Sequence, residues 1–338
     1  MASPYHLFTM LAALSHYTQN DNQMDMKRLL GVSSMSPVIK RLSHLNHYII
    51  PKQQGADAIW VNATESYRDL TTTPTIQRLV HVGTLDFRHE TKDSISAIKD
   101  WSLERTRLNH WHFPSHMINN HTQLLLTSLI KGSMPWEYPF ARGRTHLAPF
   151  YHDGIVNRVT TMHQRHFFPY HEEKTFQLAI FPFHDQMHAL AVVLPKEQVS
   201  LPDLLKRFNQ STLLSALKGV KYKDLDVSLP RVSLALDTPD IQQTLQSMGM
   251  EIAFQKSHRY HGLSYKPMLL STIIQSTRLS INEKGHHLPP KTKPKKVVNP
   301  IHPHEKDILF HANRPFLFFV FDFDTNTISL IGEVNNPA

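Results

Sequence analysis

The sequence predicts an α+β protein whose first third is rich in helices and whose remainder is rich in strands. Apolar residues recur at helical spacing early in the chain, where Ile95, Ile98 and Trp101 form a stripe among charged neighbours. From residue 124 onward the apolar runs are short and are bounded by Pro, Gly and Asp. Such runs are typical of strands in large sheets.

The predicted elements follow in chain order. A first helix is expected after Ser3, where leucines recur at helical spacing, and the clearest helix covers residues 93–105. Strands are expected at 124–130, 176–181, 189–194, 227–236, 278–281, 316–321 and 328–331. No apolar run has the length of a membrane-spanning helix, so a membrane is not expected as a partner.

The composition of the chain narrows the possible partners but not the fold. Its 338 residues are compatible with one large domain or with two ordinary ones. With 41% hydrophobic residues and no cysteine, the chain has material for a large core that must hold together without disulfides. The net charge of +8 favours anionic partners such as polysaccharides, nucleic acids or acidic protein surfaces.

One long segment cannot pack as a helix or a strand. Residues 286–304 contain several prolines and four lysines between Lys291 and Lys296, without sustained apolar periodicity. Too few residues follow this segment to form an independent domain, so the tail must return to the main core and the segment is a loop. Structureless loops longer than about 15 residues are uncommon in compact domains and are usually functional or disordered.

The loop is bracketed by Asn282-Glu-Lys-Gly285 and Ala312-Asn-Arg-Pro-Phe316, and these two motifs resemble those of the serpins, the serine-protease-inhibitor superfamily. Asn282-Glu-Lys-Gly285 is similar to the hinge that opens their reactive-centre loop, and Ala312-Asn-Arg-Pro-Phe316 is similar to the strand on which that loop ends. Further matches occur in serpin order at 162–164, 190–195, 227–231, 245–250 and 332–337.

The resemblance implies a complete architecture. We expect a single serpin domain over residues 1–338, with a large central β-sheet, further smaller sheets and surrounding helices. Residues 285–311 are expected to form an exposed reactive-centre-like loop. The resemblance also implies that the first helix of the family is absent.

In serpins, a target protease attacks this loop as a substrate, and the cut loop then inserts as an extra strand into the central sheet and traps the acyl-enzyme. The resemblance therefore implies a serine-type endopeptidase inhibitor homologue. The specificity residue is expected at Lys295 or Lys296, which suit a trypsin-like serine protease. Counting from Gly285 by the usual loop length points instead to Asn299. A third interpretation is that the lysines only keep the loop soluble.

The hinge departs from the pattern of inhibitory serpins. The resemblance assigns Glu283 and Gly285 to the hinge, and the residues that follow include His286, Pro289 and Pro290. Inhibitory members carry a threonine-like residue and a run of alanines there. Proline lacks the backbone donor that a central strand needs, so we expect insertion to stall and trapping to be impaired.

Four further residues fall in regions that resemble the shutter and breach of the serpin sheet, and these are Ser3, Ser128, Trp136 and Gln275. The family usually has an asparagine where Ser128 stands and a histidine where Gln275 stands. A hydrogen bond between Ser128 and Gln275 is still chemically possible, so we expect stability to survive while opening changes. Trp136 keeps a family signature.

The alternative function is a non-inhibitory serpin that acts as a binding or chaperone module. Basic residues in the first part of the chain lie in a region that resembles the polyanion-binding helices of the family. They are Lys27, Arg28, Lys40, Arg41 and Lys52. A sulfated polysaccharide is therefore a candidate partner. Nucleic acid is not expected as a partner, and the chain is expected to be a monomer.

Enzymatic chemistry is not expected. The chain has no nucleophile elbow, phosphate loop or HExxH motif, so we expect no catalytic residues and no cofactor. Its 24 histidines form no recognised zinc-site spacing, so no metal is expected. The N-terminus shows no secretory signal, which predicts either an intracellular protein or a processed secreted chain.

Overall fold

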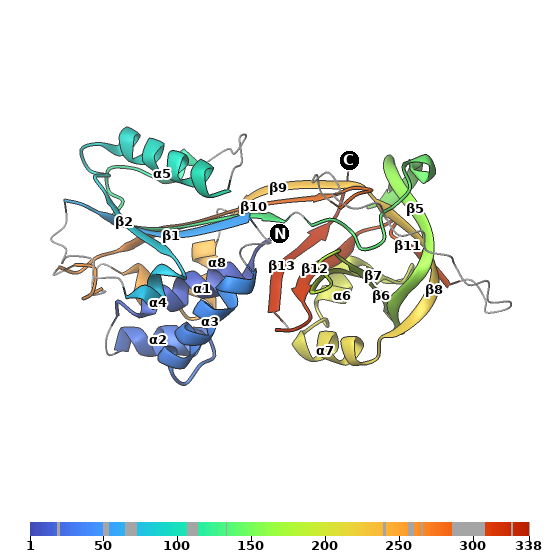
Figure 1. Ribbon diagram of the computed structural model, residues 1–338, viewed down its shortest axis with the longest axis horizontal. Helices are drawn as coiled ribbons and strands as arrows, with labels where there is room; N and C mark the ends of the chain where they lie inside the picture. Colours follow the sequence, from blue (N-terminus) through green and yellow to red (C-terminus); the bar gives the residue numbers. More distant parts are fainter. Residues whose placement is uncertain are drawn as a thin grey trace. The chain divides into compact units, whose positions relative to one another are not determined.

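The computed structural model describes most of the chain, in two compact units (Figure 1). The described residues are 1–18, 21–49, 54–64, 73–106, 114–132, 134–238, 241–255, 260–264, 266–285, 308–325 and 327–337. Unit 1 comprises Met1, Ser133–Leu234 and Leu279–Ala338, and unit 2 comprises Ala2–Gly132 and Ala235–Arg278. The single-domain organisation stays a prediction.

Unit 2 contains most of a five-stranded sheet with the order β2-β1-β3-β10-β9. Its strands are β1 (Gln54–Asn62), β2 (His81–Leu85), β3 (Leu124–Gly132), β9 (Val232–Thr238) and β10 (Leu270–Ile281). Strand β1 pairs with β2 in parallel and with β3 antiparallel. Strands β9 and β10 are each continuous with unit 1, because the boundary falls within them.

Helices cover both faces of this sheet within unit 2 (Figure 1). They are α1 (Pro4–Ser15), α2 (Asp21–Leu29), α3 (Met35–Ile49), α4 (Pro74–Gln77), α5 (Thr91–Thr106) and α8 (Ile241–Ser247), with short 3-10 turns η1 (Ser115–Met117) and η3 (Ile252–Phe254). Helix α5 packs Ile98 against Trp60 and Leu125, while α1 packs on the opposite face. The predicted apolar stripe of α5 is confirmed.

The start of helix α1 is set by an N-cap serine followed by a proline. Ser3 is the N-cap, and its Oγ accepts a hydrogen bond from the backbone N–H of His6 at 3.3 Å. Pro4 takes the first helical position, where a missing N–H costs nothing. The cap places Ser3 and His6 together at the buried start of the helix, since both are fully buried.

Unit 1 contains an eight-stranded sheet with the order β11-β8-β5-β6-β7-β12-β13 and with β4 paired to β5. The strands are β4 (His146–His152), β5 (Ile155–Glu172), β6 (Phe176–Pro182), β7 (His188–Pro195), β8 (Lys221–Pro230), β11 (Ile308–His311), β12 (Phe316–Asp322) and β13 (Thr327–Val334). Helices α6 (Leu201–Leu205) and α7 (Gln210–Lys218) pack against β6, β7 and β12. The 3-10 turn η2 (Arg142–Arg144) precedes β4.

Most predicted strands are confirmed, but the single strand predicted at 227–236 is wrong. The chain leaves the eight-stranded sheet at the end of β8, after Pro230, and re-enters the five-stranded sheet as β9 at Val232. Arg231 forms the junction, and its backbone N–H donates to Thr160 O at 2.8 Å. Residues 308–311, which the predicted loop included, form β11 and pair in parallel with β8.

Candidate functional site

The hinge turn, Asn282–Gly285, directly follows β10 and closes on itself. The backbone N–H of Gly285 donates to Asn282 O at 3.0 Å, and the backbone N–H of Lys284 donates to Asn282 Oδ1 at 3.0 Å. Gly285 has φ +87°, and a Cβ there would lie 2.2 Å from the carbonyl oxygen of Met134. Only glycine fits this position without moving the backbone.

A single segment of unit 1 holds the backbone of the hinge turn. The indole Nε1–H of Trp136 donates to Asn282 O at 2.7 Å, and its backbone N–H donates to Lys284 O at 3.2 Å. The backbone N–H of Phe140 donates to Glu283 O at 2.9 Å. Trp136 is buried and stacks on Phe183 with ring centroids 5.0 Å apart. The predicted breach residue Trp136 therefore lies against the predicted hinge.

The side chain of Glu283 is the electrostatic centre of this site. It is only 4% exposed, and its Oε1 accepts hydrogen bonds from Thr145 Oγ1 at 2.8 Å and from Arg231 Nε at 3.0 Å. The Nη2 of Arg231 also donates to this oxygen. Burial alone would raise the pKa of the Glu283 carboxyl, but these hydrogen bonds outweigh it and hold the pKa below its usual value.

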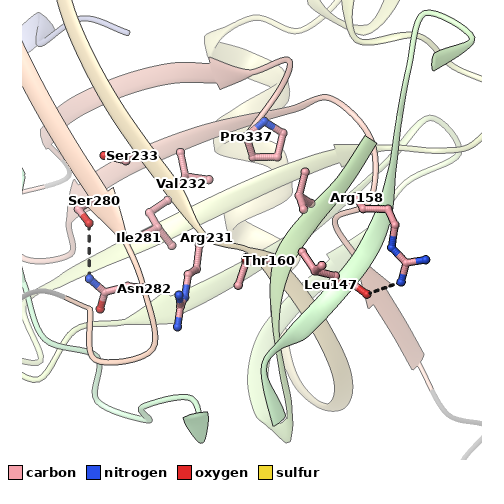
Figure 2. Close-up of a pocket in the computed structure, with 11 residues that line it drawn as sticks. Leu147, Arg158, Thr160, Arg231, Val232, Ser233, Ser280, Ile281, Asn282 and Pro337 are labelled. Carbon is pink, nitrogen blue, oxygen red and sulfur yellow. Dashed lines mark hydrogen bonds between the residues drawn. The ribbon is translucent and has the colours of Figure 1, made fainter. Parts of the chain in front are cut away.

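A cavity of about 350 Å³ opens beside the hinge turn (Figure 2). One wall is formed by the end of β10 and the start of β9, and the facing wall by β4 and β5, with Pro337 also lining the space. Asn282 reaches the cavity, where its Nδ2 donates to Ser280 Oγ at 3.5 Å. Figure 2 shows Arg158 on the β5 wall with its guanidinium donating to Leu147 O.

In unit 2, the predicted residues Ser3 and Gln275 form a reciprocal pair. The backbone N–H of Ser3 donates to Gln275 Oε1 at 2.7 Å, and Gln275 Nε2 donates back to Ser3 O at 3.1 Å. Both residues are fully buried. Gln275 thus ties β10 to the start of α1, although it replaces the histidine usual in the family.

The hydrogen bond that we considered between Ser128 and Gln275 is not formed. Gln275 is engaged with Ser3, and the fully buried Ser128 Oγ has no hydrogen-bond partner in the described part of the chain. Ser128 lies on β3, next to β10 in the sheet, and its register partner on β1 is Asp57. The sheet therefore contains an unused hydroxyl at this position.

A buried histidine–aspartate pair was missed by the sequence reasoning. His6 Nδ1 on α1 lies 2.7 Å from Asp57 Oδ2 on β1, and both side chains are at most 1% exposed. Their other polar atoms, His6 Nε2 and Asp57 Oδ1, have no hydrogen-bond partner among the described residues. The available signal was the aspartate alone in an apolar strand, because a buried carboxylate requires a partner.

The structure thus brings the predicted site residues into two groups. Glu283, Gly285 and Trp136 lie together in unit 1, and Ser3, Ser128 and Gln275 lie at the N-cap of α1, on β3 and on β10 in unit 2. The remaining predicted residues lie outside the described residues, and they are His286, Pro289, Pro290, Lys295, Lys296 and Asn299.

The basic residues of the predicted polyanion site lie on two helices of unit 2, apart from one residue. Lys27 and Arg28 lie on α2 and Lys40 and Arg41 on α3, while Lys52 lies outside the described residues. Arg28 makes an exposed ion pair with Asp25 at 3.4 Å. Over the described ranges, there is no cluster of three or more metal-ligating side chains and no helix long and apolar enough to span a membrane.

Residues 1–337 match the family described as Serpin (serine protease inhibitor). The chain belongs to the serpin family. This serpin is 24% identical to an uncharacterized serpin-like protein of Methanosarcina mazei, over 99% of this chain and 80% of that protein. It is 27% identical to antithrombin-III of Homo sapiens, over 81% of this chain and 59% of that protein.

Solved structures confirm the predicted α+β serpin fold. The crystal structure of native protease nexin-1 with heparin matches with a TM-score of 0.87, over 99% of this chain and 92% of that chain. The structure of a tumour suppressing serpin matches with a TM-score of 0.86, over the same shares of the two chains. The sequence identities are 19% and 16%, so these likenesses show the fold alone.

Proposed function

We propose that this serpin presents the segment between Gly285 and β11, residues 286–307, as a basic, proline-rich bait to a trypsin-like serine protease, and that it traps the protease poorly. The observation that carries this proposal is the fixed hinge turn. Glycine geometry, backbone hydrogen bonds and the Glu283–Arg231 contact all hold the chain where it leaves β10. These contacts fix the point at which the bait begins.

Trapping by the family mechanism requires the cut bait to become a strand of the central sheet. Both edges of β10 are already paired, with β3 and with β9, so a new strand beside β10 must separate one of these pairs. Pro289 and Pro290 would enter this strand within a few residues of the hinge. Each proline removes a ladder donor, which opposes insertion.

The experiment that tests this function is incubation with substoichiometric trypsin, read on a denaturing gel. We expect cleavage near Lys295 or Lys296 without an SDS-stable adduct. The double variant Lys295→Ala/Lys296→Ala should lose cleavage at these two bonds, whereas the matched control Lys293→Ala should be cut there like the parent, because Pro294 already disfavours cleavage after Lys293. A stable adduct would establish efficient trapping and contradict the impaired mechanism.

A second candidate function is a non-inhibitory binding or chaperone module, with a sulfated polysaccharide as a candidate ligand. The observation that favours it is the exposed pair Lys40–Arg41 on α3. Heparin-column elution would measure this. Lys40→Ala/Arg41→Ala should elute at lower salt than the parent, while the control pair Lys206→Ala/Arg207→Ala, which is also exposed, should not. Equal elution of both double variants would reject the α3 site.

A further inference from the structure

The hairpin formed by β4 and β5 exposes large apolar side chains on one face. Leu147, Tyr151 and Val156 are 54%, 49% and 55% exposed. Tyr151 is the register partner of Val156, and Leu147 is the register partner of Thr160. Because side chains alternate along each strand, these residues point to the same side of the hairpin. We define this hairpin face as Leu147, Pro149, Tyr151, Val156, Arg158 and Thr160.

The hairpin face continues into the cavity beside the hinge turn. Leu147, Arg158 and Thr160 belong to the face and also line the cavity (Figure 2). On the other side the cavity is lined by Val232 and Ile281. An apolar side chain from a partner would therefore find an apolar face next to a recess of about 350 Å³. Contiguous exposed apolar surface of this kind marks interaction sites.

The charge around the hairpin face is positive. Arg158 is exposed on the face itself, and Arg142 and Arg144 are exposed on η2, which packs against β5. Within the hairpin the acidic residue is Asp153 at the turn, where its carboxylate lies 3.3 Å from His152 Nε2. Glu283, near the cavity, already accepts hydrogen bonds from its own arginine. The surface therefore favours an anionic partner.

We propose that the hairpin face and the adjoining cavity form a docking surface for an acidic protein segment that carries an apolar side chain. Charge argues against the two occupants within this protein. Residues 286–307 carry five lysines against one glutamate and one aspartate, and a second copy of the chain brings a net charge of +8, so both are repelled by the arginines. An acidic segment is attracted by them, and its apolar side chain would bury exposed area on Tyr151 and Val156.

The interaction should depend on a few side chains. Tyrosine and arginine dominate the binding energy of protein interfaces, because they bury large areas and also make polar contacts. Tyr151 and Arg158 are the residues of this kind on the hairpin face. Two exposed residues elsewhere in unit 1 serve as matched controls: Tyr222 on β8, which is 69% exposed, and Arg165 on β5, which pairs with Asp224.

The experiment is fluorescence anisotropy with the whole chain and a labelled polyglutamate peptide that has one central phenylalanine. Tyr151→Ser and Arg158→Ala should each weaken binding about tenfold. The controls Tyr222→Ser and Arg165→Ala should leave the dissociation constant unchanged. Replacing the phenylalanine of the peptide by serine should weaken binding to the parent chain. Unchanged thermal unfolding of each variant would show that folding is intact.

Three results would overturn the proposal. Equal binding by Tyr151→Ser and Tyr222→Ser would place the peptide elsewhere. A peptide without phenylalanine that binds as tightly, or full competition by a sulfated polysaccharide that is insensitive to Tyr151→Ser, would indicate a simple polyanion site. Self-association that is lost in Tyr151→Ser would make a second copy the occupant. Trypsin cleavage of the loop is independent of these variants, so the proposed function is tested separately.

Discussion

The hinge turn in unit 1 and the polar cluster around Ser3, Asp57 and Gln275 in unit 2 differ in how completely their buried polar groups are hydrogen-bonded. In the hinge turn, backbone hydrogen bonds, a buried carboxylate and one obligatory glycine specify a single conformation. In the polar cluster, the buried hydroxyls of Ser128 and Thr277 have no partner among the described residues. The first region is fully satisfied, and the second keeps unused hydrogen-bonding capacity within the sheet.

This difference affects how easily the chain beyond the hinge turn can move and how easily the strands of the sheet can separate. A fully satisfied turn must lose several contacts before the chain beyond it can move. A sheet with unpaired buried hydroxyls loses less when its strands separate, because those groups gain water or new partners. We expect the hinge turn to resist opening. We expect the polar cluster to tolerate separation of its strands, except at two contacts that hold it together, the His6–Asp57 pair and the Ser3–Gln275 pair.

Within the polar cluster, loss of the buried His6–Asp57 pair should lower the free energy of unfolding the most. His6→Ala should lower the free energy of unfolding by about 3 kcal/mol, because it leaves a buried carboxyl without its partner. Urea denaturation would measure this. The matched control is His89→Ala, which breaks the exposed pair with Asp86 in the same unit and should change stability little. Equal effects of the two variants would contradict the role of burial.

The second contact is the reciprocal pair of Gln275 and Ser3. Gln275→Ala should lower the free energy of unfolding by about 2 kcal/mol, since it removes two buried hydrogen bonds to the Ser3 backbone. Thermal and urea unfolding would both report it. Gln243→Ala on the exposed face of α8 is the control and should be neutral. A neutral Gln275→Ala would show that the start of α1 is held by other contacts.

In the hinge turn, Glu283→Gln should lower the free energy of unfolding by about 1.5 kcal/mol at neutral pH, because Arg231 and Thr145 then donate to a neutral amide instead of a carboxylate. The folded-state pKa of Glu283 lies below its unfolded value, so its stabilisation is present above about pH 4.5 and is lost as the pH falls through the folded pKa. Unfolding measured across this range should therefore show the parent and Glu283→Gln converging in acid.

The control for this measurement is Glu251→Gln, an exposed residue of unit 2. Its stability should follow the parent at every pH. A constant gap between Glu283→Gln and the parent down to strongly acidic pH would show that the Arg231 contact does not depend on the charge of the carboxylate.

The smallest effect is expected at Ser128. Ser128→Ala should change the free energy of unfolding by less than about 0.5 kcal/mol, because the hydroxyl that is removed has no partner. The neighbouring Thr127→Val is the matched control and should be destabilising, since Thr127 Oγ1 accepts from the Trp60 indole at 2.9 Å. A large loss in Ser128→Ala would remove the contrast between the hinge turn and the polar cluster.

Much of this molecule was predictable from its sequence. The helical stripe of α5 and the strands β3, β6, β7, β12 and β13 follow from apolar spacing. The family motifs single out Asn282–Gly285 and Trp136, whose roles stay predictions. The break at Arg231 was missed because the apolar run continues across Pro230, while the two halves pair in different sheets. Strand β5 was missed because its histidines and two arginines interrupt regular alternation.

The polar contacts were less accessible to sequence reasoning. The His6–Asp57 pair joins a helix and a strand that are far apart in the chain, so no local pattern marks it. The partner of Gln275 is a backbone group at Ser3, which residue types alone do not specify. The lysines and prolines of the bait lie outside the described residues, so their roles stay predictions.

The central claim is that the bait is cleaved but inserts poorly because of Pro289 and Pro290. The most direct test is to cleave the chain with trypsin under native conditions and compare the melting temperatures of the cleaved and intact forms. We predict no increase for the parent chain and a clear increase for the double variant Pro289→Ala/Pro290→Ala, in which the backbone donors are restored. An equal increase in both would show that the parent inserts its loop and would contradict the account.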